Sequence, residues 1–308
     1  MHVLSSQQFT PKLLGDIFLK SDEFREKLKH KTQRRLLSKK YQGEVLASLF
    51  YEPSTRTRLS FEAAAHRLGL GVLSTENARI SSSAMKGESL EDSVQVVSRY
   101  VDIIVLRHSE IGAADRAARF STVPIVNAGD GGGEHPTQML LDLYTIWRKY
   151  GRLDHLTLGI GFDPKHSRAL KSLLHGLSLF KGNSVHIVAP RPGQLSSSQI
   201  ENFRNSGLRI TTSNNVDDLY AYELVYVNRF QAERFNDPSA TKPYQDAYRL
   251  TAHHVKASKI KYILHPLPRV KELDPEVDQL PQAIYFEQAE NGLYVRMALI
   301  DRLLSARL

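Results

Sequence analysis

Ser54-Thr55-Arg56-Thr57-Arg58 is the stretch from which the fold can be worked out. It alternates three hydroxyl side chains with two guanidiniums. An apolar run at residues 45–51 precedes it, and Pro53 ends that run because proline cannot continue a central strand. Beyond it, apolar residues recur at helical spacing between Phe61 and Leu68. The stretch therefore predicts a strand, a tight turn and the start of a helix.

The turn at residues 54–58 has the composition of an anion-binding site. A helix N-terminus presents unpaired N–H groups and a partial positive charge, which together attract anions. Hydroxyls add neutral donors, and arginine adds a planar fork that matches phosphate or carboxylate. The alternative is a capping hydroxyl with two solvated arginines. Because so many donors fall within one turn, the sequence favours an oxyanion site.

Strand and helix patterns alternate along the chain in two halves. The expected strands are 45–51, 70–74, 102–106 and 124–127 in the first half, and 156–161, 184–189, 208–212, 224–227 and 262–264 in the second. Helices are expected at 12–20, 22–38 and 288–308, among others. This alternation predicts two α/β domains, each with a mainly parallel sheet flanked by helices. We expect domains at residues 1–150 and 151–287, with the helix at 288–308 packing back on the first.

Length and composition are those of an ordinary globular protein. A chain of 308 residues suggests about two domains, and 41% apolar residues suffice for a sizeable core. The absence of cysteine excludes disulfides and thiolate metal sites. No apolar run approaches the ~20 residues of a membrane span. Since the N-terminal residues also lack the pattern of a secretory signal, we expect a cytoplasmic protein without membrane contact.

The net charge of +8 is concentrated most strongly between Lys27 and Lys40. This basic run contains no Phe, Tyr or Trp on which nucleic-acid bases could stack. We therefore interpret it as a solvated helix face and expect no nucleic-acid partner. Anionic small substrates remain a reason for the positive charge.

Cationic and amide side chains follow the expected strands, where α/β sheets bind ligands. They are Arg107, His135 and Gln138 in the first half, and Arg168, Arg229, Gln231 and His265-Pro266-Leu267-Pro268-Arg269 in the second. Singly, each fits a surface ion pair or a structural role. Together they indicate a site that binds several negative charges and stabilises a developing oxyanion. The chain has no glycosidase-type carboxylate pair, no metal-ligand spacing and no Gly-x-Ser-x-Gly elbow.

Three motifs resemble those of the aspartate/ornithine carbamoyltransferase family. They are Ser54 to Arg58, His135-Pro136-Thr137-Gln138 and His265 to Arg269, in the family's order and at its separations. Ornithine members typically carry a cysteine in the last motif, so this cysteine-free chain resembles the aspartate branch. The resemblance implies transfer of the carbamoyl group of carbamoyl phosphate to the amine of L-aspartate, in de novo pyrimidine biosynthesis. It also implies a site in the cleft between the domains, with no metal or organic cofactor.

The resemblance further implies individual roles. Carbamoyl phosphate would be bound by Ser54, Thr55, Arg56, Thr57, Arg107, His135, Gln138, Leu267 and Pro268, with Ser82 and Lys86 from a neighbouring subunit. Catalysis would fall to Thr57, Arg107, His135 and Lys86, and aspartate would be bound by Arg168, Arg229, Gln231 and Lys86. Domain closure would use Glu52 and Arg234 together with Arg168. The implied assembly is a homotrimer with shared sites, and regulatory chains are a further possible partner.

One stretch departs from the family pattern, and some alternatives stay open. The usual Gly-Asp after the first strand of the second half is replaced by Phe162-Asp163-Pro164. We expect these residues to narrow and stiffen the turn before Arg168 and so to affect aspartate affinity. The alternatives are a carbamoyltransferase for another amine such as ornithine, and a catalytically silent homologue with a binding role. A dinucleotide-binding protein is disfavoured because no Gly-x-Gly-x-x-Gly follows the first strand of either half.

Overall fold

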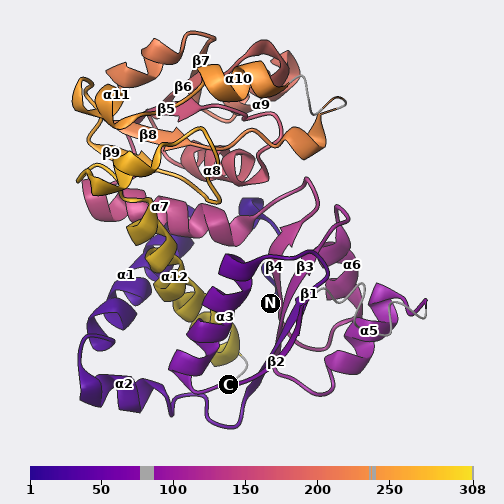
Figure 1. Ribbon diagram of the computed structural model, residues 1–308. Coiled ribbons are helices and arrows are strands. Elements are labelled where there is room, and N and C mark those ends of the chain that lie inside the picture. The colour runs from indigo at the N-terminus through magenta and orange to yellow at the C-terminus, as the bar shows by residue number, and fades with distance from the viewer. Residues whose placement is uncertain (77–86, 236, 238–240, 307–308) are drawn as a thin grey trace. The chain divides into compact units, whose positions relative to one another are not determined.

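The protein consists of two compact units that each contain a parallel sheet. The computed structural model describes residues 1–76, 87–235, 237 and 241–306 (Figure 1). One unit comprises Met1–Leu141 and Glu290–Leu308, and the other comprises Asp142–Ala289. The boundary falls inside two helices, α7 (Pro136–Tyr150) and α12 (Tyr285–Ser305). The prediction of two parallel α/β layers is therefore confirmed.

The sheet of the first unit has the strand order β2-β1-β3-β4, and every pairing in it is parallel. Its strands are β1 (Val45–Phe50), β2 (Gly71–Glu76), β3 (Ile103–His108) and β4 (Ile125–Asp130). Its helices are α1 (Pro11–Lys27), α2 (Lys31–Leu37), α3 (Thr55–Leu68), α5 (Leu90–Val97) and α6 (Ala113–Phe120). Figure 1 shows α3 on one side of this sheet and α5 and α6 on the other. The central strands are covered on both faces, which is why they form nearly continuous apolar runs.

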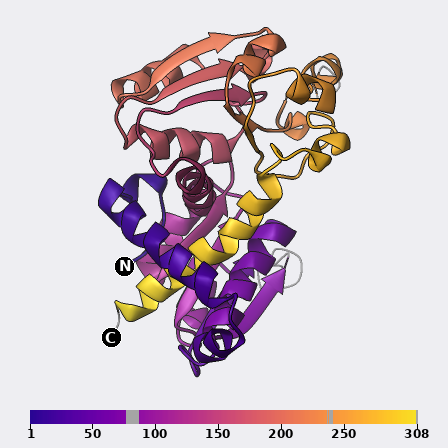
Figure 2. The same cartoon turned by 90° about the vertical axis from the view of Figure 1, so that its left-hand side faces the viewer.

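The C-terminal part of α12 packs beside α1 in the first unit, as Figures 1 and 2 both show. The Arg25 guanidinium donates to the Asn291 side chain at 2.9 Å. Farther along, the Tyr41 hydroxyl donates to the Asp301 carboxylate at 2.8 Å, and Lys40 pairs with the same carboxylate. These contacts attach the end of the chain to its beginning.

The sheet of the second unit has the strand order β7-β6-β5-β8-β9 and is also parallel. Its strands are β5 (Thr157–Gly161), β6 (Ser184–Val188), β7 (Arg209–Ser213), β8 (Leu224–Val227) and β9 (Tyr262–Leu264). Its helices are α8 (Arg168–Ser178), α9 (Ser197–Asn205), α10 (Lys242–Ala247) and α11 (Ala252–Lys256). The α8 helix places its leucines inward, and a buried cluster that includes Phe162, Leu219 and Val225 forms part of the core.

Helix boundaries differ from the sequence prediction. The helix expected at 22–38 is interrupted, because α1 ends at Lys27 and α2 begins at Lys31. The break expected at Ser21 is absent because that side chain is buried and its hydroxyl donates to the Ile17 carbonyl at 2.7 Å, so α1 continues to Lys27. The last helix begins at Tyr285 rather than near residue 288. Gly292 lies inside this helix: a Cβ there would lie 3.1 Å from the Leu141 side chain, so the glycine allows close packing.

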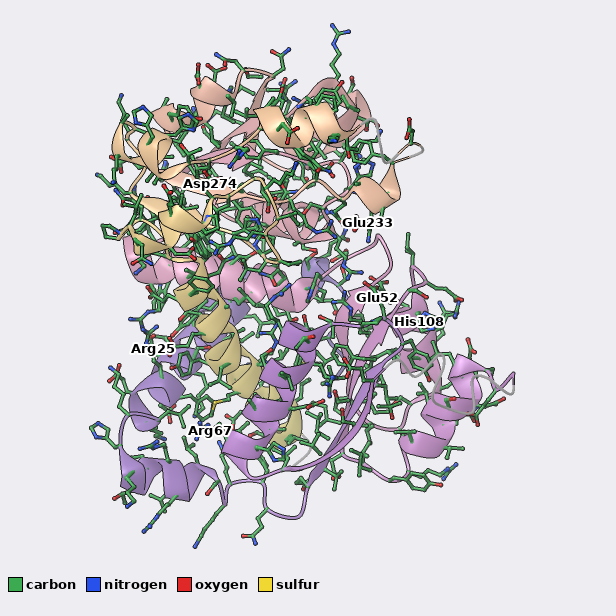
Figure 3. The ribbon with its side chains drawn as sticks, in the orientation of Figure 1. Arg25, Glu52, Arg67, His108, Glu233 and Asp274 are labelled. Carbon is green, nitrogen blue, oxygen red and sulfur yellow. The ribbon has the colours of Figure 1, made fainter. Side chains whose placement is uncertain are left out.

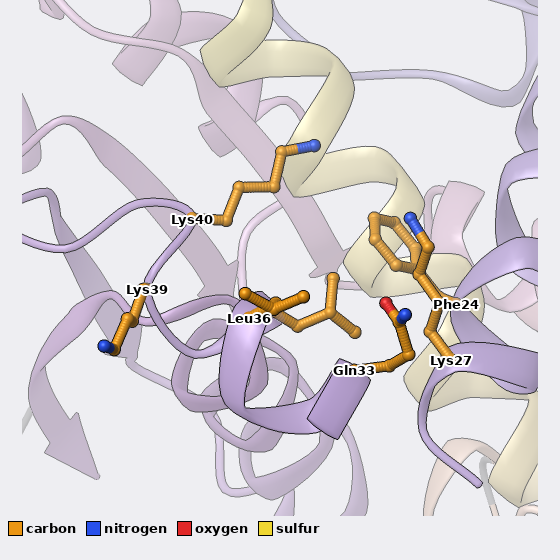
Figure 4. Close-up of a pocket in the computed structure, with 7 residues that line it drawn as sticks. Phe24, Lys27, Gln33, Leu36, Lys39 and Lys40 are labelled. Atoms are coloured by element: carbon orange, nitrogen blue, oxygen red, sulfur yellow. The ribbon is translucent and has the colours of Figure 1, made fainter. Parts of the chain in front are cut away.

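The basic run from Lys27 to Lys40 lies on the end of α1, on α2 and on the turn that follows. A pocket of about 330 Å³ lies here, lined by Phe24, Lys27, Gln33, Leu36, Leu37, Lys39 and Lys40 (Figure 4). The Lys39 side chain points away from Lys27 and Lys40. Lys27 pairs with Glu23, as Lys40 does with Asp301. The amino groups of Lys27, Lys39 and Lys40 therefore do not converge on a common anion.

None of the helices in the described part of the chain combines the length and the apolar content needed to cross a membrane.

Gly69, which caps α3, gives a direct test of this packing. Its φ is +93°, and a Cβ at this position would lie 2.4 Å from the Ser38 carbonyl oxygen. We expect Gly69→Ala to lower the free energy of unfolding by at least about 2 kcal/mol, since both the left-handed backbone and the clash oppose a side chain. Urea unfolding measures the change.

Gly15→Ala is the matched control because Gly15 lies within α1 with open space around its Cβ position. It should stabilise the protein by about 0.5–1 kcal/mol. Equal unfolding free energies for the two variants would contradict the close approach at Gly69.

Candidate active site

The N-terminus of α3 presents donors that the helix itself does not use. Ser54 occupies the N-cap position with extended backbone, and its hydroxyl makes no capping hydrogen bond. The backbone N–H groups of the first turn, from Thr55 onward, have no partner within the helix. Thr57 is buried in this turn, with 7% of its surface exposed. The expected strand, turn and helix start are thus present as β1 and α3.

The two arginines of this turn differ in their partners. Arg58 donates to Glu62 at 3.2 Å and to Glu76 at 2.9 Å, so it ties α3 to β2. Arg56 has no carboxylate partner among the residues that the structure describes. Partial burial lowers the pKa of Arg56, which indicates that its charge is not compensated by a neighbour. Arg56 is therefore the cation available to a ligand, and Arg58 is structural.

Arg107 lies on β3 and is held by residues from both neighbouring strands. Its guanidinium donates to the Glu52 carboxylate at 2.7 Å and to the Ala128 carbonyl at 3.4 Å. Glu52 and His108, labelled in Figure 3, follow β1 and end β3, and the His108 ring packs on Tyr51 with centroids 5.0 Å apart. Arg107 is only 8% exposed, so the carboxylate offsets the cost of burying its charge. The structure thus places Glu52, expected at a domain-closure bridge, on Arg107.

The loop between β4 and α7 carries His135 and is organised by Asp130. The Asp130 carboxylate accepts from the backbone N–H of Gly112 at 2.8 Å and of Glu134 at 3.0 Å. The His135 carbonyl accepts from the Gln138 backbone N–H at 3.0 Å, which starts α7. His135 and Gln138 are 6% and 9% exposed. The glycine run is therefore folded against a carboxylate rather than open.

Strand register brings these first-unit residues to one edge of the sheet. Phe50 is paired with Arg107, and His108 is paired with Asp130. Because all three strands are parallel, the segments that follow β1 and β4 leave from the same carboxyl edge. The edge therefore gathers the Arg56 turn, Arg107 and the His135 loop.

In the second unit, the turn after β5 is organised by Asp163 and Asn228. Asp163 is fully buried and accepts from the backbone N–H of Gln231 at 3.0 Å. Its other oxygen lies 2.8 Å from Nδ1 of His166. Burial raises the pKa of Asp163, and these hydrogen bonds act in the opposite direction. The Asn228 amide donates to the Asp163 carbonyl at 3.0 Å, so the two turns are joined.

The arginines expected to bind aspartate lie at the start of α8 and after β8. Arg168 is the first residue of α8, which Ser167 caps. Arg229 donates to Glu233 at 3.0 Å, and this hydrogen bond lowers the pKa of Glu233. Arg234, expected to act in closure, donates to the His166 carbonyl at 3.4 Å. Arg234, which follows β8, is therefore bonded to the backbone of the segment that leads from β5 to Arg168.

The loop after β9 is held by the His265 imidazole. Its Nδ1 accepts from the Leu267 backbone N–H at 2.8 Å, so Nε2 carries the proton and donates to Glu272 at 2.8 Å. His265 is 2% exposed and Glu272 is 3% exposed. Leu267 has φ +53°, a conformation that is costly for leucine. The imidazole thus ties the strained Leu267 backbone to the Glu272 carboxylate.

The departure from the family pattern at residues 162–164 is absorbed by the core. The Phe162 ring is fully buried and packs edge-on against Tyr248, with centroids 5.6 Å apart. The ring therefore points into the second unit's core, while Asp163 remains available to organise the turn.

Ser82 and Lys86 lie outside the described residues. Several organising side chains were not singled out from the sequence: Asp130, Glu134, Asn228, Glu233 and Glu272. Only Glu233 had a local signal, because it follows Arg229 by four residues. Within residues 1–76, 87–235, 237 and 241–306, no group of three or more His, Asp or Glu side chains could hold a metal ion.

Comparison with known proteins gives consistent matches over both units. Residues 1–148 match the model of the aspartate/ornithine carbamoyltransferase carbamoyl-P binding domain, and residues 154–303 match that of the Asp/Orn binding domain. The chain is 42% identical over 304 residues to the aspartate carbamoyltransferase catalytic subunit of Methanocaldococcus jannaschii, covering 98% of this chain and 97% of that one.

Solved structures are similar over the same extent. A crystal structure of the M. jannaschii aspartate transcarbamoylase catalytic subunit matches with a TM-score of 0.91 at 42% identity, covering 99% of this chain and 98% of that one. The Trypanosoma cruzi aspartate transcarbamoylase, in complex with N-(phosphonacetyl)-L-aspartic acid, matches with a TM-score of 0.90 at 31% identity. That match covers 98% of this chain and 95% of the T. cruzi chain.

The His265 contact generates a stability prediction. His265→Ala would leave the Leu267 N–H and the Glu272 carboxylate buried without their partner. We expect the free energy of unfolding to fall by about 2–4 kcal/mol. Chemical denaturation measures this, with His253→Ala, at an exposed position on α11, as the control expected to stay within about 0.5 kcal/mol. A His265→Ala protein as stable as the parent would rule out this role.

Proposed function

Because the chain belongs to the aspartate/ornithine carbamoyltransferase family, we propose that it is an aspartate carbamoyltransferase. It transfers the carbamoyl group of carbamoyl phosphate to the amine of L-aspartate, giving N-carbamoyl-L-aspartate and phosphate for pyrimidine biosynthesis. The observation that carries the proposal is Arg56 at the N-terminus of α3, which has no carboxylate partner among the described residues and lies beside helix N–H groups that can donate to a phosphate.

The first domain binds carbamoyl phosphate. We assign it to residues 1–150 together with 288–308. The phosphate is held by the first turn of α3, through Ser54, Thr55, Arg56 and Thr57. Thr57, Arg107 and His135 contact the carbonyl oxygen, and Gln138 with the carbonyls of Leu267 and Pro268 holds the NH2 group. The position of the first-domain residues at one sheet edge supports this division.

The second domain, residues 151–287, binds L-aspartate. A dicarboxylate needs two cationic partners, and Arg168 and Arg229 provide planar forks for them. Gln231 adds an amide and has its backbone held by Asp163. Glu233 already orients the Arg229 guanidinium, so the substrate carboxylate competes with Glu233 for it.

The reaction is an acyl transfer without a covalent enzyme intermediate. The deprotonated aspartate amine attacks the carbamoyl carbon, and the carbonyl electrons move onto oxygen. Thr57, Arg107 and His135 stabilise that oxyanion. When it collapses, the bond from carbon to the phosphate oxygen breaks, and the departing phosphate takes the amine proton. Positioning and electrostatics supply most of the acceleration.

Assembly and closure complete the proposal. We propose a homotrimer in which Ser82 and Lys86 enter the site of a neighbouring subunit, which sedimentation analysis would test. Glu52, Arg168 and Arg234 are proposed to bridge when substrates bind, so Glu52 would be shared with Arg107. Regulatory chains are a further possible partner, and we expect the protein to work in the cytoplasm.

A two-substrate assay tests the function. Purified protein with carbamoyl phosphate should release phosphate when aspartate is added and should form N-carbamoyl-L-aspartate. Ornithine should give no product, because its side-chain ammonium would face Arg168 or Arg229. Turnover with ornithine alone would make the protein a carbamoyltransferase for another amine. No turnover with either amine would favour a catalytically silent homologue.

Two variants test the division of labour between the domains. Arg56→Ala should lower kcat about 100-fold or more, because the leaving phosphate loses a preorganised charge. Arg229→Ala should raise the KM for aspartate about 10- to 100-fold, the loss of a charge-assisted hydrogen bond. Steady-state kinetics with each substrate varied measures both effects.

Arg67→Ala is the matched control for Arg56→Ala, since Arg67 is exposed in the last turn of the same helix (Figure 3). It should leave both parameters unchanged. The opposite pattern, with Arg229→Ala reducing kcat and Arg56→Ala affecting only aspartate KM, would show that the roles are assigned wrongly.

A further inference from the structure

The first eight residues of the chain are fastened to the strand that leads to His135. Val3 pairs with Val126 of β4 in parallel, donating to the Ile125 carbonyl at 2.8 Å and accepting from the Asn127 backbone N–H at 2.8 Å. The Asn127 side chain adds a hydrogen bond to the Leu4 carbonyl at 2.8 Å. This N-terminal segment therefore extends the edge of the sheet beside β4.

Where the segment leaves β4, its serines bind the carboxylate of Glu134. The Ser5 hydroxyl donates at 2.8 Å, the Ser6 backbone N–H donates at 2.5 Å, and the Ser6 hydroxyl also donates. Ser6 is 1% exposed, and Ser5 caps the short 3-10 helix η1 (Ser6–Gln8). Three donors on one carboxylate hold the Glu134 side chain in a single position.

The backbone of the same loop is held from the opposite side by Asp130. Asp130 accepts from the Glu134 N–H through its side chain and from the Gly133 N–H through its carbonyl at 2.8 Å. A Cβ at Gly133 would lie 2.9 Å from the Asp130 carboxylate, so the loop needs glycine to close this tightly. A run of three glycines has high conformational entropy, and it keeps one path only if such contacts select it.

Glu134 directly precedes His135, so the contacts that hold Glu134 also restrict the backbone of His135. On the other side of His135, its carbonyl is already bonded to the N–H groups of Gln138 and Met139 at the start of α7. The Glu134 contacts add a constraint on how the loop enters the helix, from the N-terminal side of His135. Any movement of Glu134 changes the backbone from which the buried imidazole projects.

We propose that Glu134 is a positioning residue for His135, and that the N-terminal serines act on the active site through it. The inference rests on the proposed function, in which His135 stabilises the oxyanion at the carbamoyl carbon. A displacement of about 1 Å at such a group can reduce the rate 100-fold, so an anchor next to it affects catalysis without contacting substrate.

The test is a double-mutant cycle between Glu134 and His135. Glu134→Ala should lower kcat about tenfold or more while the KM for aspartate stays within about twofold, because only the oxyanion contact is misplaced. In the His135→Ala background the same change should have no further effect on kcat. Glu134→Gln, which keeps an acceptor oxygen of the same reach, should retain most of the activity, and Ser5→Ala combined with Ser6→Ala should resemble Glu134→Ala.

Glu110→Ala is the matched control, a carboxylate in the neighbouring loop that bonds Arg116 at 2.7 Å on the surface. It should leave kcat unchanged. The inference would be wrong if Glu134→Ala lowered kcat equally in the parent and in the His135→Ala protein, or if Glu134→Ala kept full activity. Either result would leave the proposed function standing. Full activity of His135→Ala would instead remove the role assigned to His135 in the proposed function, and the inference with it.

Discussion

The unneutralised positive charge at the start of α3 is the interaction on which the rest of the site depends. Burying or half-burying a cation is unfavourable unless an anion compensates it. The protein compensates Arg58 with Glu62 and Glu76, and Arg107 with Glu52. Arg56 lies on the same turn as Arg58, exposed beside the helix N–H groups, and has no carboxylate partner in the described chain. In the proposed function, the phosphate of the substrate supplies the negative charge that Arg56 lacks.

Carboxylates organise both halves of the site rather than reacting. Asp130 and Glu134 fold the loop that carries His135, and Asp163 holds the Gln231 backbone. Glu233 orients Arg229, and Glu272 holds the imidazole that supports Leu267. Each acidic residue fixes a cation or a backbone segment that is proposed to meet substrate. Because these carboxylates hold the binding groups in position beforehand, the groups need little reorganisation when charge develops in the transition state.

The sequence predicted the parallel strands well because buried parallel strands form apolar runs that end at polar turns. It predicted helix ends less well, because Ser21 is buried within α1 with its hydroxyl bonded one turn back to Ile17, and Gly292 packs against Leu141. The candidate residues came from motifs, and their roles remain proposals. The side chains of Glu134 and Asn228, which hold two of the loops in place, were not predicted, because Ser5 and Phe162, to which they bond, lie more than 60 residues away in the chain.

A crystal structure with N-(phosphonacetyl)-L-aspartic acid, the ligand of the T. cruzi complex, would test the central claim most directly. We predict that the phosphonate binds at the first turn of α3 with Arg56 as its cationic partner, while Arg58 stays on Glu62 and Glu76. A phosphonate held by Arg58, or bound away from the N-terminus of α3, would contradict the claim.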